Sequence, residues 1–123
     1  FDCGVCSYAN RIKEQVLGVS HETLETLGAV SEETAAQMAA GVRKLSKADI
    51  GVSTTGIAGP DGGTEEKPVG LVYVGVDSEN YTTVLECRLS RGYDNERELI
   101  RYLASSHALR LALTAAEKAA KKN

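Results

Sequence analysis

The stretch I-G-V-S-T-T-G-I-A-G-P-D-G-G-T-E-E-K-P-V-G-L-V-Y-V-G-V-D, residues 50–77, decides the fold of this chain. A β-branched run enters it and a second one leaves it, and both favour strands. The loop between them, from Gly56 to Pro68, holds both prolines of the protein and four of its twelve glycines. Because glycine lets a ligand approach the main chain, we interpret it as a binding loop. An ordinary surface hairpin connection is the alternative.

The composition is that of a globular protein with a single domain, which we place at residues 1–123. Apolar residues make up 42% and charged residues 25% of the chain, a balance that argues against disorder. No apolar run approaches membrane-spanning length, so we expect a cytoplasmic protein without a membrane partner. The net charge is −3, and the basic cluster Lys118, Lys121 and Lys122 suits a solvated helix end better than a nucleic-acid surface.

Three cysteines, Cys3, Cys6 and Cys87, raise the question of metal or redox chemistry. Cys3 and Cys6 form a C-x-x-C pair, but positions i and i+3 of a strand point to opposite faces. No second such pair and no nearby histidine completes a tetrahedral metal site. The odd count is also untypical of a secreted disulfide framework. We therefore predict buried structural thiols and no metal.

Hydrophobic periodicity predicts the following elements: a strand over Phe1–Tyr8, a helix over Asn10–Leu17, a helical turn over Leu24–Leu27, a helix from the N-cap Ser31 to about Lys44–Ser46, strands over Ala48–Thr55, Val69–Val76 and Tyr81–Leu89, and a helix over about Asn95–Lys121. The nearly uninterrupted apolar run of Ala48–Thr55 predicts burial on both faces. Tyr81–Leu89 alternates and predicts an edge strand or an exposed face.

This order of elements predicts an α/β fold, a three-layer α/β/α sandwich around a mixed sheet. Because the chain opens inside its first predicted strand, we expect the domain to lack its N-terminal strand and helices in this sequence.

Two groups of residues could carry chemistry. Tyr8 ends the first predicted strand and Lys13 lies early in the next helix, which can bring a phenol and an amine to one end of the sheet. A lysine in a cleft acts as a general base if desolvation lowers its pKa, and it can then activate a hydroxyl nucleophile. An interface tyrosine and a solvated lysine are the alternative, which the residues alone favour.

The second group is the opening of the loop, Thr54–Gly59, where hydroxyls and backbone N–H groups follow the carboxyl end of a strand. Ligands of α/β folds gather at that end. The loop matches neither a Walker A nor a Rossmann pattern. Nearby Asp61, Glu65 and Glu66 fit no EF-hand spacing and indicate a solvated acidic loop. The lone His107 of the last helix is interpreted as a packed or half-exposed helix residue.

The string T-G-I-A-G-P-D-G-G-T-E-E-K-P-V-G-L-V-Y-V-G, residues 55–75, closely resembles the signature of the CinA C-terminal domain family. This competence/damage-inducible family includes nicotinamide mononucleotide deamidases. Residues 7–13 and 17–19 resemble the family's A-Y-S-N-x-x-K-x-x-L-G-V, residues 28–35 its G-A-V-S-E-E-T-A, and residues 97–101 its R-x-x-V/I-R. The resemblance covers essentially the whole chain in the right order.

The resemblance implies an amidohydrolase that converts nicotinamide mononucleotide to nicotinic acid mononucleotide and ammonia. Family members use a serine with a tyrosine and a lysine, and no metal or other cofactor. The resemblance carries the tyrosine and lysine over to Tyr8 and Lys13 as catalytic residues. The implied substrate-binding residues are Asn10, Thr55, Gly56, Ile57, Ala58, Gly59 and Arg97.

One departure from the family concerns the nucleophile. The family's serine lies in an E-S-x-T-G-G motif upstream of the tyrosine's strand, and these 123 residues contain no such motif. Ser7 is no substitute because it belongs to the tyrosine's own strand. A fragment and an inactive remnant are both compatible with this departure.

Two functions other than catalysis stay open. One is a non-catalytic nucleotide-binding or regulatory domain of the same fold. The other is a structural oligomerisation domain built on the Ala-rich last helix, and we expect a homo-oligomer.

Overall fold

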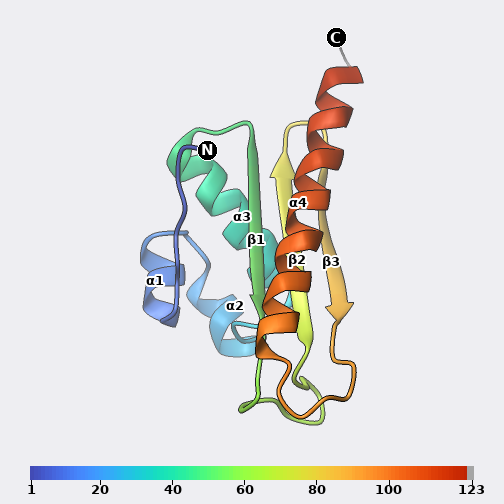
Figure 1. Ribbon diagram of the computed structural model, residues 1–123. Coiled ribbons are helices and arrows are strands. Elements are labelled where there is room, and N and C mark those ends of the chain that lie inside the picture. The colour runs from blue at the N-terminus through green and yellow to red at the C-terminus, as the bar shows by residue number, and fades with distance from the viewer. Residues whose placement is uncertain (122–123) are drawn as a thin grey trace.

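The computed structural model describes residues 1–121 and shows helices on both faces of a three-stranded sheet (Figure 1). Along the chain the elements are α1 (Asn10–Gln15), α2 (His21–Thr26), α3 (Glu32–Ser46), β1 (Ile50–Gly56), β2 (Leu71–Ser78), β3 (Thr82–Arg88) and α4 (Arg97–Lys121). The predicted helices and the three later strands are confirmed, with ends that differ by a few residues. The α/β class is confirmed with them.

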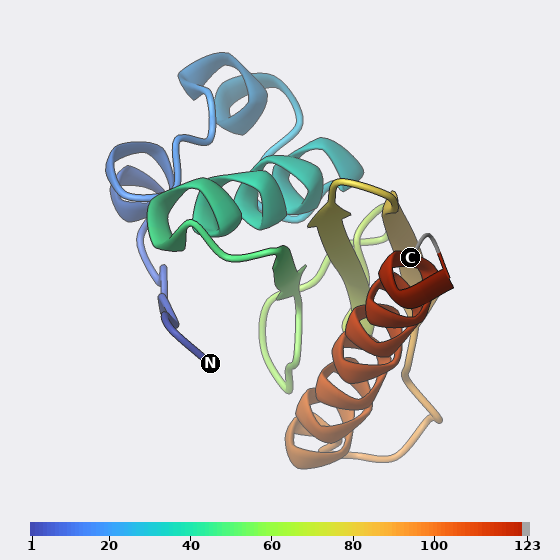
Figure 2. The same cartoon turned by 90° about the horizontal axis from the view of Figure 1, so that it is seen from above.

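The sheet is antiparallel throughout the described residues, in the order β1-β2-β3. Val52 of β1 faces Val76 of β2, and Val74 of β2 faces Leu85 of β3. Helix α3 packs on one face and α4 on the other, so β2 lies between two helices (Figure 2). β3 is an edge strand, as its alternating pattern predicted.

On the α4 face the core consists of β-branched and small side chains. Val72, Val74 and Cys87 pack against Ile100 and Ala104. Val74 is 0% and Ile100 is 1% exposed. Full burial of a side chain of this size contributes about 1.5–3 kcal/mol. This apolar contact therefore holds α4 against the sheet.

On the other face, α3 lies directly on the backbone of the sheet because two strand positions are glycine. A Cβ at Gly51 would lie 2.2 Å from the carbonyl oxygen of Ala39, and one at Gly75 would lie 2.7 Å from the carbonyl oxygen of Ala35. The hydroxyl of Ser53 donates to the same Ala35 carbonyl at 2.6 Å. No larger residue fits at either glycine without moving the helix.

The ends of α3 follow the sequence signals. The Ser31 hydroxyl oxygen accepts a hydrogen bond from the Thr34 N–H at 3.1 Å, which confirms the predicted N-cap. Such a cap contributes about 1 kcal/mol. Glu32 and Glu33 occupy the first turn, where negative charge suits the helix dipole. The helix ends at Lys47, whose φ of 59° turns the chain toward β1.

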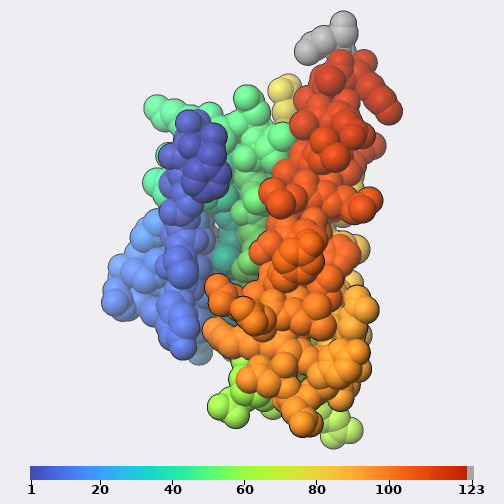
Figure 3. Space-filling model, viewed as in Figure 1, coloured from blue at the N-terminus to red at the C-terminus, as the bar shows by residue number. Residues whose placement is uncertain are grey.

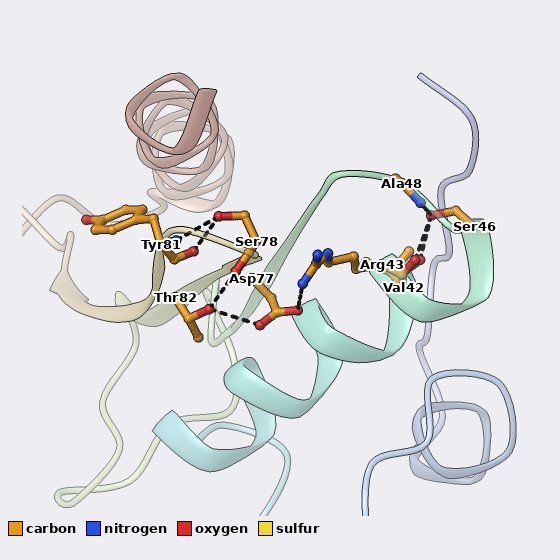
Figure 4. A network of polar contacts seen from close by, with 8 residues as sticks. All are labelled: Val42, Arg43, Ser46, Ala48, Asp77, Ser78, Tyr81 and Thr82. Atoms are coloured by element: carbon orange, nitrogen blue, oxygen red, sulfur yellow. Dashed lines mark hydrogen bonds and ion pairs between the residues drawn. The ribbon is translucent and has the colours of Figure 1, made fainter. Parts of the chain in front are cut away.

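Polar side chains fix the end of the sheet where β2 turns into β3 (Figure 4). Arg43 Nη1 of α3 pairs with Asp77 Oδ2 at 3.2 Å, and Asp77 Oδ1 accepts a hydrogen bond from Thr82 Oγ1 at 3.1 Å. The Ser78 hydroxyl donates to the Tyr81 carbonyl at 2.7 Å and accepts from the Tyr81 N–H at 3.0 Å. These contacts close the turn and tie α3 to it.

The predicted strand at Phe1–Tyr8 is wrong, because this segment forms no regular structure. Its exposure alternates: Cys3, Val5 and Ser7 are partly buried and the even positions are exposed. However, no backbone hydrogen bond joins it to β1 among residues 1–121, and an extended segment without a ladder is not a strand. The parallel pairing that a mixed sheet requires is therefore not present in the described residues.

Two predictions of burial are also wrong. Only alternate residues of β1 are buried, and Val52 is 37% exposed on the face toward α4, where Thr54 is exposed as well. α4 packs against both β1 and β2, but Val52 and Thr54 face a hollow that lies between α4 and the N-terminal segment. Among the cysteines, Cys87 is buried as predicted, but Cys6 is exposed and Cys3 only partly buried, because their segment lies outside the sheet.

The remaining surface predictions are confirmed for the exposed acidic loop residues Asp61, Glu65 and Glu66, for the partly buried His107 and for the exposed Lys118 and Lys121. The Lys118 ammonium also lies 5.2 Å from the centroid of the Tyr81 ring. Lys122 lies outside the described residues. No helix within residues 1–121 has both the length and the apolar character needed to cross a membrane.

Candidate functional site

Both groups of candidate residues lie toward the same end of the molecule. The N-terminal segment and β1 run in the same direction, so the start of α1 and the end of β1 lie toward one end of the molecule (Figure 1). The two groups therefore lie toward one end of the sheet, as expected from the sequence, although Phe1–Tyr8 is not a strand.

Lys13 is the buried charged residue of this region, with 7% of its surface exposed. Its Nζ donates a hydrogen bond to the carbonyl oxygen of Ser7 at 2.5 Å. Burial lowers the pKa of the Lys13 amine below its usual range, and the nearby Cys6 opposes that shift by raising it. The alternative that Lys13 is a solvated surface lysine is therefore excluded in this structure. A desolvated amine is closer to the neutral form that can accept a proton.

Tyr8 and Asn10 are not brought against Lys13. Tyr8 is 96% exposed, and Asn10 is exposed in the first turn of α1. No hydrogen bond joins the Tyr8 hydroxyl to Lys13 within residues 1–121. α1 begins without a side-chain cap at Ala9, and the turn is held by the Ile12 and Lys13 N–H groups, which donate to the Ala9 carbonyl.

The loop after β1 is pinned at its base. The Thr55 hydroxyl donates to the carbonyl of Ala29 at 2.6 Å, which ties the end of β1 to the connection between α2 and α3. The Ile57 N–H donates to the Leu71 carbonyl at 3.0 Å, and the Gly70 N–H donates to the Ile57 carbonyl at 2.7 Å. Ile57 therefore continues the pairing with β2 one residue past β1.

Beyond that base, the loop presents free main-chain donors. The N–H groups of Ala58 and Gly59 form no hydrogen bond among the described residues. Gly59 has φ of 78°, and a Cβ there would lie 2.6 Å from Cγ1 of Val69. Glycine is required at this position for both reasons. Ala58 is partly buried and Gly59 is buried, so these two donors lie in a largely enclosed part of the loop.

Arg97 joins the loop to α4. Its Nη1 donates to the Gly59 carbonyl at 3.0 Å, across 38 residues of sequence. The rest of the guanidinium is free to contact a ligand, since the residue is exposed at the start of α4. The structure therefore brings the weaker sequence candidate, Arg97, into contact with the predicted binding loop.

Glu96 has a structural role next to Arg97 that the sequence prediction missed. Its carboxylate accepts hydrogen bonds from the Ser90 hydroxyl at 2.6 Å, from the Arg91 N–H at 2.6 Å and from the Tyr93 N–H at 3.1 Å. The bond from Ser90 is the main cause that lowers the pKa of Glu96, while burial opposes the shift. Glu96 thus holds the turn before α4 and with it the position of Arg97. An acidic residue just before a helix was the available signal.

The sequence prediction also missed the structural role of Lys67. Its Nζ donates to the Leu27 carbonyl at 2.5 Å, 40 residues away in sequence, so no local pattern predicts the contact. Together with the Thr55–Ala29 bond, it fastens the loop to the connection between α2 and α3. Within residues 1–121, no three His, Cys, Asp or Glu side chains lie close enough to hold a metal ion.

Comparisons with known proteins agree on one family. A family model described as the CinA C-terminal domain matches residues 1–116. A protein of Thermoanaerobacter pseudethanolicus, named a competence-damage inducible protein, is 54% identical over 109 residues, which cover 89% of this chain and 25% of that protein. The chain spans about a quarter of the length of such curated relatives.

Two solved structures have the same fold. The competence/damage inducible protein CihA of Agrobacterium tumefaciens is 43% identical with a TM-score of 0.83, and the match covers 89% of this chain and 65% of that chain. A competence-damaged protein (CinA) superfamily protein of Escherichia coli is 30% identical with a TM-score of 0.78, and the match covers 87% of this chain and 60% of that chain. The chain therefore spans less than two thirds of either solved relative.

Proposed function

This chain belongs to the CinA C-terminal domain family, and on that premise we propose that it forms part of a nicotinamide-nucleotide amidase site. The proposed reaction hydrolyses the carboxamide of nicotinamide mononucleotide to nicotinic acid mononucleotide and ammonia. The names of the relatives support the family, and the activity rests on the residues of the site.

The observation that carries the proposal is the buried amine of Lys13. A general base must hold a free lone pair near neutral pH, and an ordinary solvated lysine does not. Burial lowers the pKa of this amine, and the Ser7 carbonyl orients it through one hydrogen bond. Lys13 is therefore suited to accept a proton from a hydroxyl nucleophile.

The loop after β1 supports stabilisation of the charge that develops on the substrate oxygen. Attack on a carboxamide places negative charge on its oxygen, and preorganised N–H donors stabilise that charge. In this proposal the N–H groups of Ala58 and Gly59, which form no hydrogen bond among the described residues, serve as these donors. Arg97, held by its bond to Gly59, offers its remaining guanidinium nitrogens to the phosphate of the nucleotide. Tyr8 assists or orients the substrate in this proposal.

The nucleophile of the proposed reaction is a serine supplied from outside these 123 residues. Its oxygen forms a bond to the carboxamide carbon while its proton moves to Lys13. The C–N bond then breaks, and Lys13 returns the proton to the departing nitrogen, which leaves as ammonia. Water hydrolyses the acyl ester by the same route and regenerates the serine.

The test compares turnover with binding in the longest natural chain that contains these residues. Ammonia release from nicotinamide mononucleotide is measured by a coupled assay, and binding is measured by calorimetry. Release of one ammonia for each nicotinic acid mononucleotide supports the amidase. Binding without ammonia would instead favour a regulatory domain, and an absence of binding would refute both.

A further inference from the structure

Glu96 connects the start of α4 to the core of the molecule. It is 6% exposed, although its neighbours Asn95 and Arg97 are exposed. Its carbonyl oxygen accepts the Ile100 N–H at 2.8 Å, and Ile100 is 1% exposed in the core on the α4 face. The main chain of Glu96 is therefore fixed to the part of the helix that packs on the sheet.

The side chain of Glu96 holds the preceding turn, residues 90–96, with both carboxylate oxygens. Oε1 accepts the N–H groups of Arg91 and Tyr93, and Oε2 accepts the hydroxyl of Ser90. Gly92, with φ of 85°, lets the chain reverse between these donors. Hydrogen bonds to an ionised acceptor are roughly twice as strong as those between neutral groups. This one carboxylate therefore determines the shape of the turn.

The turn meets the loop after β1 at two points. Figure 3 shows the orange surface of the turn beside the green surface of the loop at the lower end of the molecule. Just before the turn, the Leu89 N–H donates to the Gly70 carbonyl at 2.8 Å, and just after it, Arg97 Nη1 donates to the Gly59 carbonyl at 3.0 Å. Glu96 thus closes a ring of hydrogen bonds that joins the two segments.

We propose that Glu96 is a positioning residue that sets the affinity for a phosphorylated ligand through Arg97. This inference rests on the proposed function, in which Arg97 contacts the phosphate of the nucleotide. A guanidinium binds phosphate best when two of its N–H groups meet two oxygens, so the affinity depends on its orientation. Without the Glu96 carboxylate the ring opens at the residue next to Arg97, and ordering the guanidinium then costs part of the binding free energy.

Glu96 does not act as a direct contact of the ligand. It is buried, and both of its carboxylate oxygens accept hydrogen bonds from the turn. A carboxylate in contact with a phosphate would also repel it, so removal of a direct contact would tighten binding. Removal of a positioning residue weakens binding instead. The two roles therefore predict changes of opposite sign.

The test measures the Kd of nicotinamide mononucleotide by calorimetry in the longest natural chain that contains these residues. Glu96→Ala removes all three side-chain bonds and should raise the Kd about tenfold or more. Glu96→Gln keeps an oxygen for the two N–H groups and an amide that can donate to the Ser90 hydroxyl, so its Kd should stay within about threefold of the wild type. Glu98→Ala is the control, because Glu98 is exposed in the first turn of α4 and forms no side-chain hydrogen bond among the described residues.

Two comparisons separate positioning from a general loss of structure. In an Arg97→Ala background, Glu96→Ala should not change the Kd further, since a residue that acts through Arg97 has nothing left to position. Nicotinamide riboside, which lacks the phosphate, should bind the wild type and Glu96→Ala equally.

The proposal is overturned by equal losses for the nucleotide and the riboside, by an effect that persists without Arg97, or by tighter binding in Glu96→Ala. A wild type that does not bind the nucleotide overturns it as well. Binding does not require turnover, so nucleotide binding without ammonia release would refute the amidase and leave the comparison of Kd values intact.

Discussion

Replacing Thr55 with valine tests whether the end of β1 is fixed by its side-chain bond to the connection between α2 and α3. Thr55 is 8% exposed, and its hydroxyl donates to the Ala29 carbonyl at 2.6 Å. Valine keeps the branched shape and removes the donor, which leaves that carbonyl without this bond. The loss of a hydrogen bond costs about 0.5–1.5 kcal/mol, and an unsatisfied buried acceptor costs up to about 3 kcal/mol. Because Ala29 is only partly buried, we expect a loss of about 1–2 kcal/mol.

The assay is urea unfolding, with Thr54→Val as the matched control. Thr54 is the neighbouring residue of β1, is exposed and forms no side-chain hydrogen bond among the described residues. With a slope of about 2 kcal/mol per molar urea, Thr55→Val should lower the midpoint by about 0.5–1 M. Thr54→Val should change stability by less than about 0.5 kcal/mol. Equal midpoints for the two variants would refute the anchoring role of the Thr55 hydroxyl.

Two further predictions concern the start of α4. The Ser90 bond lowers the pKa of Glu96, so its stabilising effect is present above the usual carboxyl pKa and is lost as pH falls through the lower folded value. The urea midpoint of the wild type should therefore fall more steeply than that of Glu96→Gln between about pH 7 and pH 3, and parallel curves would contradict this. Arg97→Met removes the bond to the Gly59 carbonyl and should speed exchange of the hydrogen-bonded Ile57 and Gly70 amides about tenfold. Arg101→Met on the same helix should not change that exchange, and equal effects would contradict the contact.

Much of the fold could be predicted from local patterns. The N-cap at Ser31, the two β-branched runs around the Gly-rich loop and the long Ala-rich helix are each specified by nearby residues. The strand at Phe1–Tyr8 could not be predicted correctly in the same way. Its composition is that of a strand, but a strand exists only with a neighbour, and the described residues contain none for it.

The candidate site was predictable in part. The loop residues were identified by the resemblance of residues 55–75 and Arg97 by that of residues 97–101, and the structure brings Arg97 to Gly59. The contact of Lys67 was missed because a partner 40 residues away leaves no local signal. The contacts of Glu96 are local, and the acidic residue just before a helix was a signal that the prediction did not use. The roles of Tyr8 and Lys13 stay predictions, and the burial of the Lys13 amine is the structural support that the sequence could not supply.

The role of Lys13 as the base is tested most directly by ammonia release from nicotinamide mononucleotide by the Lys13→Arg variant of the longest natural chain. Arginine keeps the positive charge but cannot give up its proton, so it cannot act as a base. Lys44→Arg, at an exposed position of α3, is the control. Lys13→Arg is expected to lower kcat by about 10²–10⁴-fold, while Lys44→Arg retains the wild-type rate. An unchanged kcat in Lys13→Arg would contradict the assignment of Lys13 as the base.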